Sequence, residues 1–197
     1  MSDGFSLAVQ YASAARNLPT RAQFRRWIKA ALHPQEVCRR VPGSFAATLP
    51  LQREVHITMR IVDEPEGREL NRNYRGRDYA TNVLTFVYDD VQPRHGGVEP
   101  FGAGGAAERL FPQSAGSASN VSQPLPLSGD IVICAPVAER EAAGQHKVLL
   151  AHYAHLTLHA ALHLQGFEHE NDADAAEMEA LETALMLKLR YPDPYRT

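Results

Sequence analysis

The sequence predicts a single domain, spanning residues 1–197, in which one β-sheet is covered by helices. A chain of 197 residues is long enough for one hydrophobic core but too short for two full-sized domains. Hydrophobic residues make up 44% of it and charged residues 22%, a composition typical of globular proteins and not of disordered ones. Segments with strand character alternate with segments of helical periodicity, and no internal repeat is visible.

The N-terminal part predicts a strand followed by a helix. Residues 6–11 form a short strand candidate. Thr20 and Gln23 have the spacing of a capping box, which predicts that a helix begins with RAQFRRWIKAAL. Apolar residues repeat at helical spacing along this segment, and Pro34 ends it.

The middle of the chain predicts two strands joined by a helix. Residues 54–62 alternate apolar side chains with polar ones and contain strong strand formers. Asp63 is the expected N-cap of a helix that carries Pro65 in its first turn and ends at Gly76. Residues 82–88 (NVLTFVY) are an almost continuous apolar run, which indicates a buried strand.

Residues 92–128 differ in amino-acid composition from the rest of the chain. They are rich in Gly, Ala, Ser and Pro and show no sustained periodicity. A structureless segment of this length is uncommon inside a compact domain. We therefore expect a flexible insertion, and favour a passive surface excursion over a lid on a substrate.

The C-terminal part predicts one more strand and three helices. Residues 129–134 (GDIVIC) form the strand, and Pro136 opens a short helix. A longer helical segment covers residues 149–165 and is ended by Gly166. Asn171 is placed to cap the last helix, which carries an apolar stripe.

Charge and cysteine usage narrow the possible functions. The net charge of −3 argues against a basic nucleic-acid coat, so any contact with RNA must come from a local patch. One dense basic run lies at residues 68–77, whereas the acidic stretch 170–182 is expected to be a solvated face turned away from RNA. Cys38 and Cys134 form no Cys-x-x-Cys motif, and no apolar run approaches the roughly 18 residues of a membrane span. We expect a cytoplasmic protein without a membrane partner.

The histidines are concentrated near the C-terminus, where five of the nine lie between positions 152 and 169. His159 and His163 are four residues apart and share one face of a helix, and Gly166 lets the chain turn so that His169 reaches the same point. Three imidazoles with an open fourth position are typical of catalytic zinc. We therefore predict one zinc ion at these histidines, although nickel, copper or iron would also suit them.

Two alternatives qualify this interpretation. His152 and His155 lie on the same helical face, and we expect them to pack or to support the ligands rather than to bind the ion. The spacing His-x-x-x-His-x-x-Gly-x-x-His is also that of metzincin metallopeptidases, which carry a glutamate as general base after the first histidine. Here that position is Ala160. A metallopeptidase lacking the usual glutamate remains an alternative.

Three ordered motifs carry a family resemblance. In chain order, the motifs are LNRNYRGRDYATNVLTF at residues 70–86, the strand segment GDIVIC at residues 129–134 and HAALHLQGFEH at residues 159–169. The tail DPY at residues 193–195 fits the same pattern. In these motifs and their order the chain resembles the YbeY family of bacterial endoribonucleases. Ala160 departs from the glycine of the family pattern, and the insertion is longer than expected.

The resemblance implies an α+β fold with a small mixed β-sheet and a His-rich metal-binding helix. It implies a zinc-dependent endoribonuclease specific for single-stranded RNA, which matures the 3′ end of 16S rRNA and acts in late small-subunit maturation and quality control. The implied partners are rRNA, the small ribosomal subunit and its assembly factors, and the implied catalytic arginine is Arg75. A non-catalytic assembly factor with a structural metal remains an alternative, and the oligomeric state is open.

Overall fold

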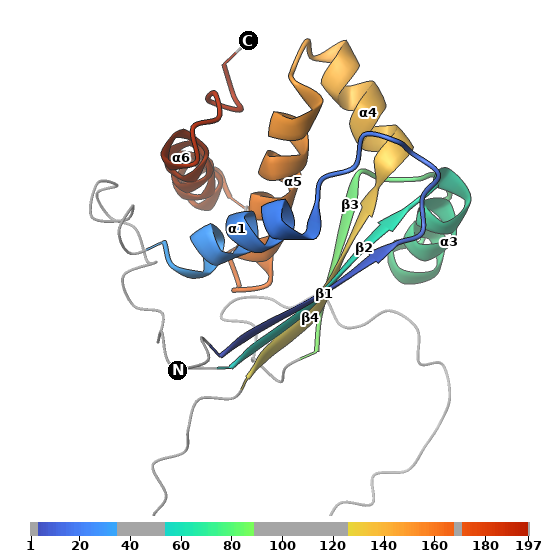
Figure 1. Ribbon diagram of the computed structural model, residues 1–197, viewed down its shortest axis with the longest axis horizontal. Coiled ribbons are helices and arrows are strands. Elements are labelled where there is room, and N and C mark those ends of the chain that lie inside the picture. The colour runs from blue at the N-terminus through green and yellow to red at the C-terminus, as the bar shows by residue number, and fades with distance from the viewer. Residues whose placement is uncertain (1–3, 35–53, 89–125, 168–170, 197) are drawn as a thin grey trace, which may run out of the picture.

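The computed structural model describes residues 4–34, 54–88, 126–167 and 171–196, which form one α+β domain (Figure 1). Within these ranges there are four strands and five helices. In chain order they are β1 (Phe5–Tyr11), α1 (Arg21–Leu32), β2 (Val55–Val62), α3 (Glu64–Arg75), β3 (Val83–Val87), β4 (Leu127–Cys134), α4 (Ala135–Gly144), α5 (Leu149–His163) and α6 (Asp172–Lys188). The predicted fold class is confirmed.

The four strands form one mixed sheet in the order β1-β2-β4-β3. β1, β2 and β4 are parallel, and β3 runs antiparallel to β4. β3 is therefore an edge strand, and of its five residues only Leu84 is buried. The strand predicted at residues 82–88 is confirmed, but the expectation that it is buried is wrong, because β3 has a strand neighbour on one side only within the described residues.

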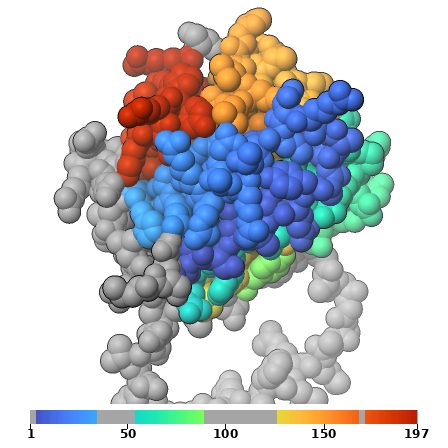
Figure 2. All heavy atoms as spheres, viewed as in Figure 1, coloured from blue at the N-terminus to red at the C-terminus, as the bar shows by residue number. Residues whose placement is uncertain are grey.

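The two faces of the sheet are covered by different helices (Figure 1). Side chains alternate between the faces along each strand, so Ile131 and Ile133 belong to the main core with residues of α1, α5 and α6. Val132 and Cys134 point to the other face, where a smaller cluster includes Leu70 of α3. In Figure 2, α1 and β1, in blue, lie between α6, in red, and α3, in teal.

Most of the predicted helix boundaries are confirmed by their caps. Thr20 and Gln23 form the capping box of α1, and the side chain of Asn171 accepts from two backbone N–H groups at the start of α6. Gly76 ends α3 in the left-handed conformation, with φ +67°. Asp63 is the N-cap residue of α3, but its carboxylate makes no capping bond. It accepts instead from Ser13 and the following backbone N–H, in the loop after β1.

The predicted insertion at residues 92–128 overlaps the sheet at its C-terminal end. β4 begins at Leu127, so residues 127 and 128 belong to a strand and not to a loop. The remainder, apart from residue 126, lies outside the described residues. In the described ranges, no helix has both the length and the apolar character that crossing a bilayer requires.

Candidate functional site

The candidate site is built on one face of α5. Four histidines lie along this face, spaced three or four residues apart: His152, His155, His159 and His163. The ring centroids of His155 and His159 are 6.3 Å apart, and those of His159 and His163 are 4.5 Å apart. The other sides of α5 are apolar and buried in the main core, so the helix holds its histidine face in a fixed position.

His159 and His163 form the pair that fits a metal ion. Their Nε2 atoms face each other at 3.1 Å. Two imidazole nitrogens bound at about 2.0–2.1 Å to one tetrahedral zinc ion lie about 3.4 Å apart. The observed separation is close to this value, so both nitrogens can become ligands of one ion with only a small movement.

His169, the third predicted ligand, lies outside the described residues. Gly166 has φ +86°, a left-handed conformation that turns the chain out of the helix, as the sequence predicts. Within the described ranges, no group of three or more His, Cys, Asp or Glu side chains surrounds a common metal position. The three-histidine site therefore stays a prediction.

Glu182 of α6 is the functional residue that sequence reasoning missed. Its carboxylate is fully buried, and Oε1 lies 2.7 Å from Nδ1 of His159 while Oε2 lies 3.1 Å from Nε2 of His155. The expectation of a solvated acidic face at residues 170–182 is therefore wrong at this position. The spacing along the helix could have predicted this burial. Glu182 is four residues after Met178 and three before Leu185, on the buried stripe of α6.

The electrostatics of this cluster determine the proton positions on the histidines. Burial alone raises the pKa of Glu182, but the hydrogen bonds from His155 and His159 outweigh it and lower the pKa well below the ordinary value. An ionised carboxylate only accepts hydrogen bonds, so His159 must donate from Nδ1. An imidazole that keeps its proton on Nδ1 can bind a metal ion through Nε2, which is the tautomer that a metal ligand needs.

Tyr195 completes the surroundings of Glu182. Its hydroxyl donates to Oε2 of Glu182, and its ring packs edge-on against His155 with centroids 5.4 Å apart. Burial, followed by the hydrogen bond to Glu182, raises the pKa of Tyr195. Asp193 accepts from the backbone N–H of Tyr195 and from Thr183, which fixes this C-terminal segment against α6. The DPY motif thus places Tyr195 on the buried carboxylate.

His152 is supported by a second carboxylate, on α4. Its Nε2 lies 2.9 Å from Oε2 of Glu141, and Asn82 donates to both oxygens of the same carboxylate. The hydrogen bond from His152 is the main cause that lowers the pKa of Glu141. His152 is thus held to α4 through Glu141, whereas His155 shares the carboxylate of Glu182 with His159.

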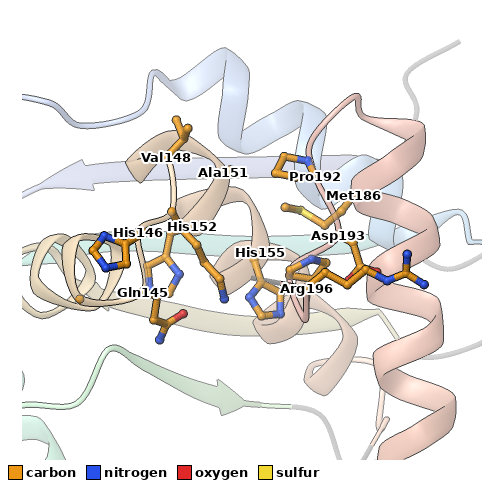
Figure 3. Close-up of a pocket in the computed structure, with 13 residues that line it drawn as sticks. Gln145, His146, Val148, Ala151, His152, His155, Met186, Pro192, Asp193 and Arg196 are labelled. Carbon is orange, nitrogen blue, oxygen red and sulfur yellow. The ribbon is translucent and has the colours of Figure 1, made fainter.

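A cavity of about 440 Å³ adjoins this histidine face (Figure 3). Its walls come from the α4–α5 connection, α5, the end of α6 and the C-terminal segment. Val148, Met186 and Pro192 make it apolar, whereas His152 and His155 contribute polar ring atoms. A second cavity of about 250 Å³ is bordered by the next members of the site, His159, Glu182 and Tyr195. The histidine face is thus accessible from two hollows.

Arg75, the predicted catalytic arginine, lies in the last turn of α3 and is exposed. In the described part of the chain its guanidinium makes no hydrogen bond or ion pair, whereas the neighbouring Arg68 makes two hydrogen bonds to Asp78. α3 covers the sheet face opposite α5, so the structure does not join Arg75 to the histidines by a direct contact. A free guanidinium of this kind can bind a phosphate through two parallel hydrogen bonds.

The family model and the relatives that match this chain carry the same family name. A family model described as "Endoribonuclease YbeY" matches residues 21–190. Many relatives carry this same name, and three of them illustrate the similarity. The one from Nitrosospira multiformis is 44% identical over 96% of this chain and 80% of its own, and the one from Chromobacterium violaceum is 46% identical over 84% and 81%. The one from Thiobacillus denitrificans is 40% identical over the full length of both chains.

Proposed function

The chain belongs to the YbeY family of endoribonucleases, and from this premise we propose that it is a zinc-dependent endoribonuclease that hydrolyses phosphodiester bonds in single-stranded RNA. The observation that carries the proposal is the pair of facing Nε2 atoms of His159 and His163, oriented by the buried Glu182. A helix that presents two imidazoles in this way, next to a turn leading to a third histidine, is suited to hold one ion with an open position.

His159, His163 and His169 are the residues that would hold the zinc ion. When bound there, the ion would supply Lewis acidity toward a phosphoryl oxygen or toward a water molecule. Glu182 holds the proton on Nδ1 of His159 and keeps the ring from rotating. His155 and Tyr195 satisfy the remaining carboxylate oxygen, so that the carboxylate cannot turn away from His159.

Arg75 is the proposed phosphate-binding residue. Its exposed guanidinium is not engaged by any acidic side chain in the described residues. An arginine can bind two phosphate oxygens of an RNA strand through parallel, charge-assisted hydrogen bonds. In this proposal the arginine approaches the RNA backbone while the histidines of α5 approach the reacting phosphate.

We assign the substrate to rRNA of the small ribosomal subunit, at the 3′ end of 16S rRNA, during late maturation and quality control in the cytoplasm. This assignment follows from the family resemblance. The ribosomal subunit and its assembly factors are then the expected partners.

The metallopeptidase alternative has little support from the structure. Ala160, which takes the position of the peptidase glutamate, is fully buried in the main core. Its methyl group cannot accept a proton, so the general base that a metallopeptidase carries directly after its first histidine is missing from this position.

The proposal is tested by measuring zinc content and cleavage of a single-stranded RNA before and after chelation. The purified protein should contain about one zinc per chain, lose activity on chelation and regain it with added zinc. His163→Ala should lose both metal and activity. Full cleavage by metal-free protein would refute the metal-dependent mechanism. Stoichiometric zinc without any cleavage would instead favour a non-catalytic assembly factor with a structural metal.

A further inference from the structure

Three tyrosine side chains are exposed around the ends of α3 and β3. The exposed fractions are 56% for Tyr74, 52% for Tyr79 and 64% for Tyr88. Large aromatic side chains usually bury most of their surface, so three exposed rings in the short segment from the end of α3 to the end of β3 indicate a binding surface. Together with the exposed Arg72 and Arg77, these residues are called the Arg–Tyr surface below.

The rings of the Arg–Tyr surface are held in place by local contacts. Tyr74 packs edge-on against Phe86 of β3, with centroids 4.9 Å apart. Tyr88 lies two residues further along, on the same side of the strand, and its hydroxyl donates to a carboxylate of β4 at 2.7 Å. The hydroxyl of Tyr79 accepts from Arg77 at 3.2 Å. Rings already fixed in this way lose little conformational entropy when a ligand stacks on them.

The charge of this region complements a phosphate backbone. Arg68, Arg72, Arg75 and Arg77 are all exposed within one short stretch, although the whole chain carries a net charge of −3. The nearby Asp78 is engaged by Arg68, at 2.6 Å, and lies at the limit of an ion pair with Arg72, at 4.0 Å. Basic side chains interleaved with exposed aromatic rings are the combination by which proteins bind unpaired nucleotides.

The Arg–Tyr surface borders the same sheet edge as the end of α5 that carries the histidine pair. A Cβ atom placed on Gly129 would lie 2.5 Å from the carbonyl oxygen of Phe86 and 2.6 Å from Cδ2 of Leu164. Leu164 directly follows His163, so this end of α5 packs closely on the β3–β4 pair. α3 contacts β3 from the opposite face, where Tyr74 packs against Phe86. An RNA strand can therefore pass around the edge formed by β3, from one region to the other.

We propose that the Arg–Tyr surface binds unpaired nucleotides of the RNA substrate, whose bases stack on Tyr74, Tyr79 and Tyr88 while the arginines contact the phosphates. The inference rests on the proposed endoribonuclease function, because that function makes RNA the ligand. It adds a substrate-binding surface to Arg75 and the histidines. The RNA would run from this surface around the β3 edge to the point where the reacting phosphate lies.

The test is RNA binding without cleavage, measured on zinc-depleted full-length protein by fluorescence anisotropy with a labelled, unstructured RNA oligonucleotide. Tyr79→Ala and Tyr88→Ala should each weaken binding by about 5- to 150-fold, the loss expected for one stacked base. Tyr79→Phe and Tyr88→Phe keep the rings for stacking but lose the hydroxyl hydrogen bonds that fix them, so they should lose much less affinity than the alanine variants. Arg77→Gln should reduce the salt dependence of log Kd by about 0.7, the contribution of one phosphate contact in single strands.

Tyr11→Ala is the matched control, because Tyr11 is also an exposed tyrosine, 47% exposed, but lies on β1 at the opposite edge of the sheet. It should leave RNA binding unchanged. Unaltered RNA affinity of the Tyr79→Ala and Tyr88→Ala proteins, with melting temperatures equal to the wild type, would overturn the proposal and leave the surface to a protein partner. A different result would contradict only the proposed function: the protein binds RNA through this surface but cleaves no RNA after zinc is restored.

Discussion

Replacing Glu182 by Gln is the sharpest perturbation of the histidine site. The substitution preserves the size of the side chain but removes the charge and turns one acceptor oxygen into an NH₂ donor. Three donors point at this carboxylate: Nδ1–H of His159, Nε2–H of His155 and the hydroxyl of Tyr195. A carboxamide has one oxygen, so at least one donor must face the NH₂ group in a fully buried place.

The size of the effect follows from these contacts. Leaving one buried donor without an acceptor, together with losing charge-assisted hydrogen bonds, costs about 2–3 kcal/mol of unfolding free energy. For a chain of this size that lowers the melting temperature by roughly 4–12 °C. Losing the carboxylate that orients a ligand histidine should also weaken zinc binding by about 10- to 100-fold.

Both quantities are measurable on the purified protein. Differential scanning calorimetry gives the melting temperature of the metal-free form, and competition with a chromophoric chelator gives the zinc affinity. Glu69→Gln removes the same charge from an exposed position on α3, outside both cavities, and should change neither value. If Glu182→Gln binds zinc as tightly as the wild type, the carboxylate does not position His159, and the reasoning is refuted.

Three further predictions concern other parts of the molecule. The pKa of Glu141 is lowered mainly by its hydrogen bond from His152, so this group stabilises the fold fully above pH 4.5 and loses the effect as the pH falls through its folded pKa. The melting temperatures of Glu141→Gln and wild type should therefore differ at pH 7, and the difference should shrink as the pH falls below 4.5. Gly129→Ala should cost about 1–3 kcal/mol in chemical denaturation, because the new methyl group meets the fixed carbonyl oxygen of Phe86; an unchanged midpoint would contradict the tight packing there. Arg75→Glu should keep the melting temperature and zinc content but lose RNA cleavage, whereas loss of folding would make Arg75 structural.

Features that depend on neighbours in the sequence could be predicted well. The capping box at Thr20 and Gln23, the cap at Asn171 and the left-handed Gly76 each involve residues a few positions apart, and all three are present in the structure. The facing pair of His159 and His163 is of the same kind, because one turn of helix is enough to bring the two rings together.

Features that depend on distant segments were missed. Glu182 is buried because two histidines of α5 and Tyr195 of the C-terminal segment surround it, and none of these partners can be located from the sequence of α6 alone. Asp63 does not cap α3 because its carboxylate accepts a hydrogen bond from Ser13, which is fifty residues away in the sequence. The edge position of β3 is likewise decided by strand order, which an apolar run of residues does not specify.

The buried carboxylate also links metal binding to the motions of α6. Glu182 belongs to α6 while the histidines that it supports belong to α5, so a local opening that undocks α6 also releases the ring of His159. Any ligand that binds only the docked form makes such openings rarer, by about 2.7 kcal/mol when its concentration is one hundred times its Kd. Zinc should therefore slow amide hydrogen exchange in the middle of α6, although no residue there needs to touch the ion. The exchange rate in this helix then reports the fraction of the protein that has zinc bound.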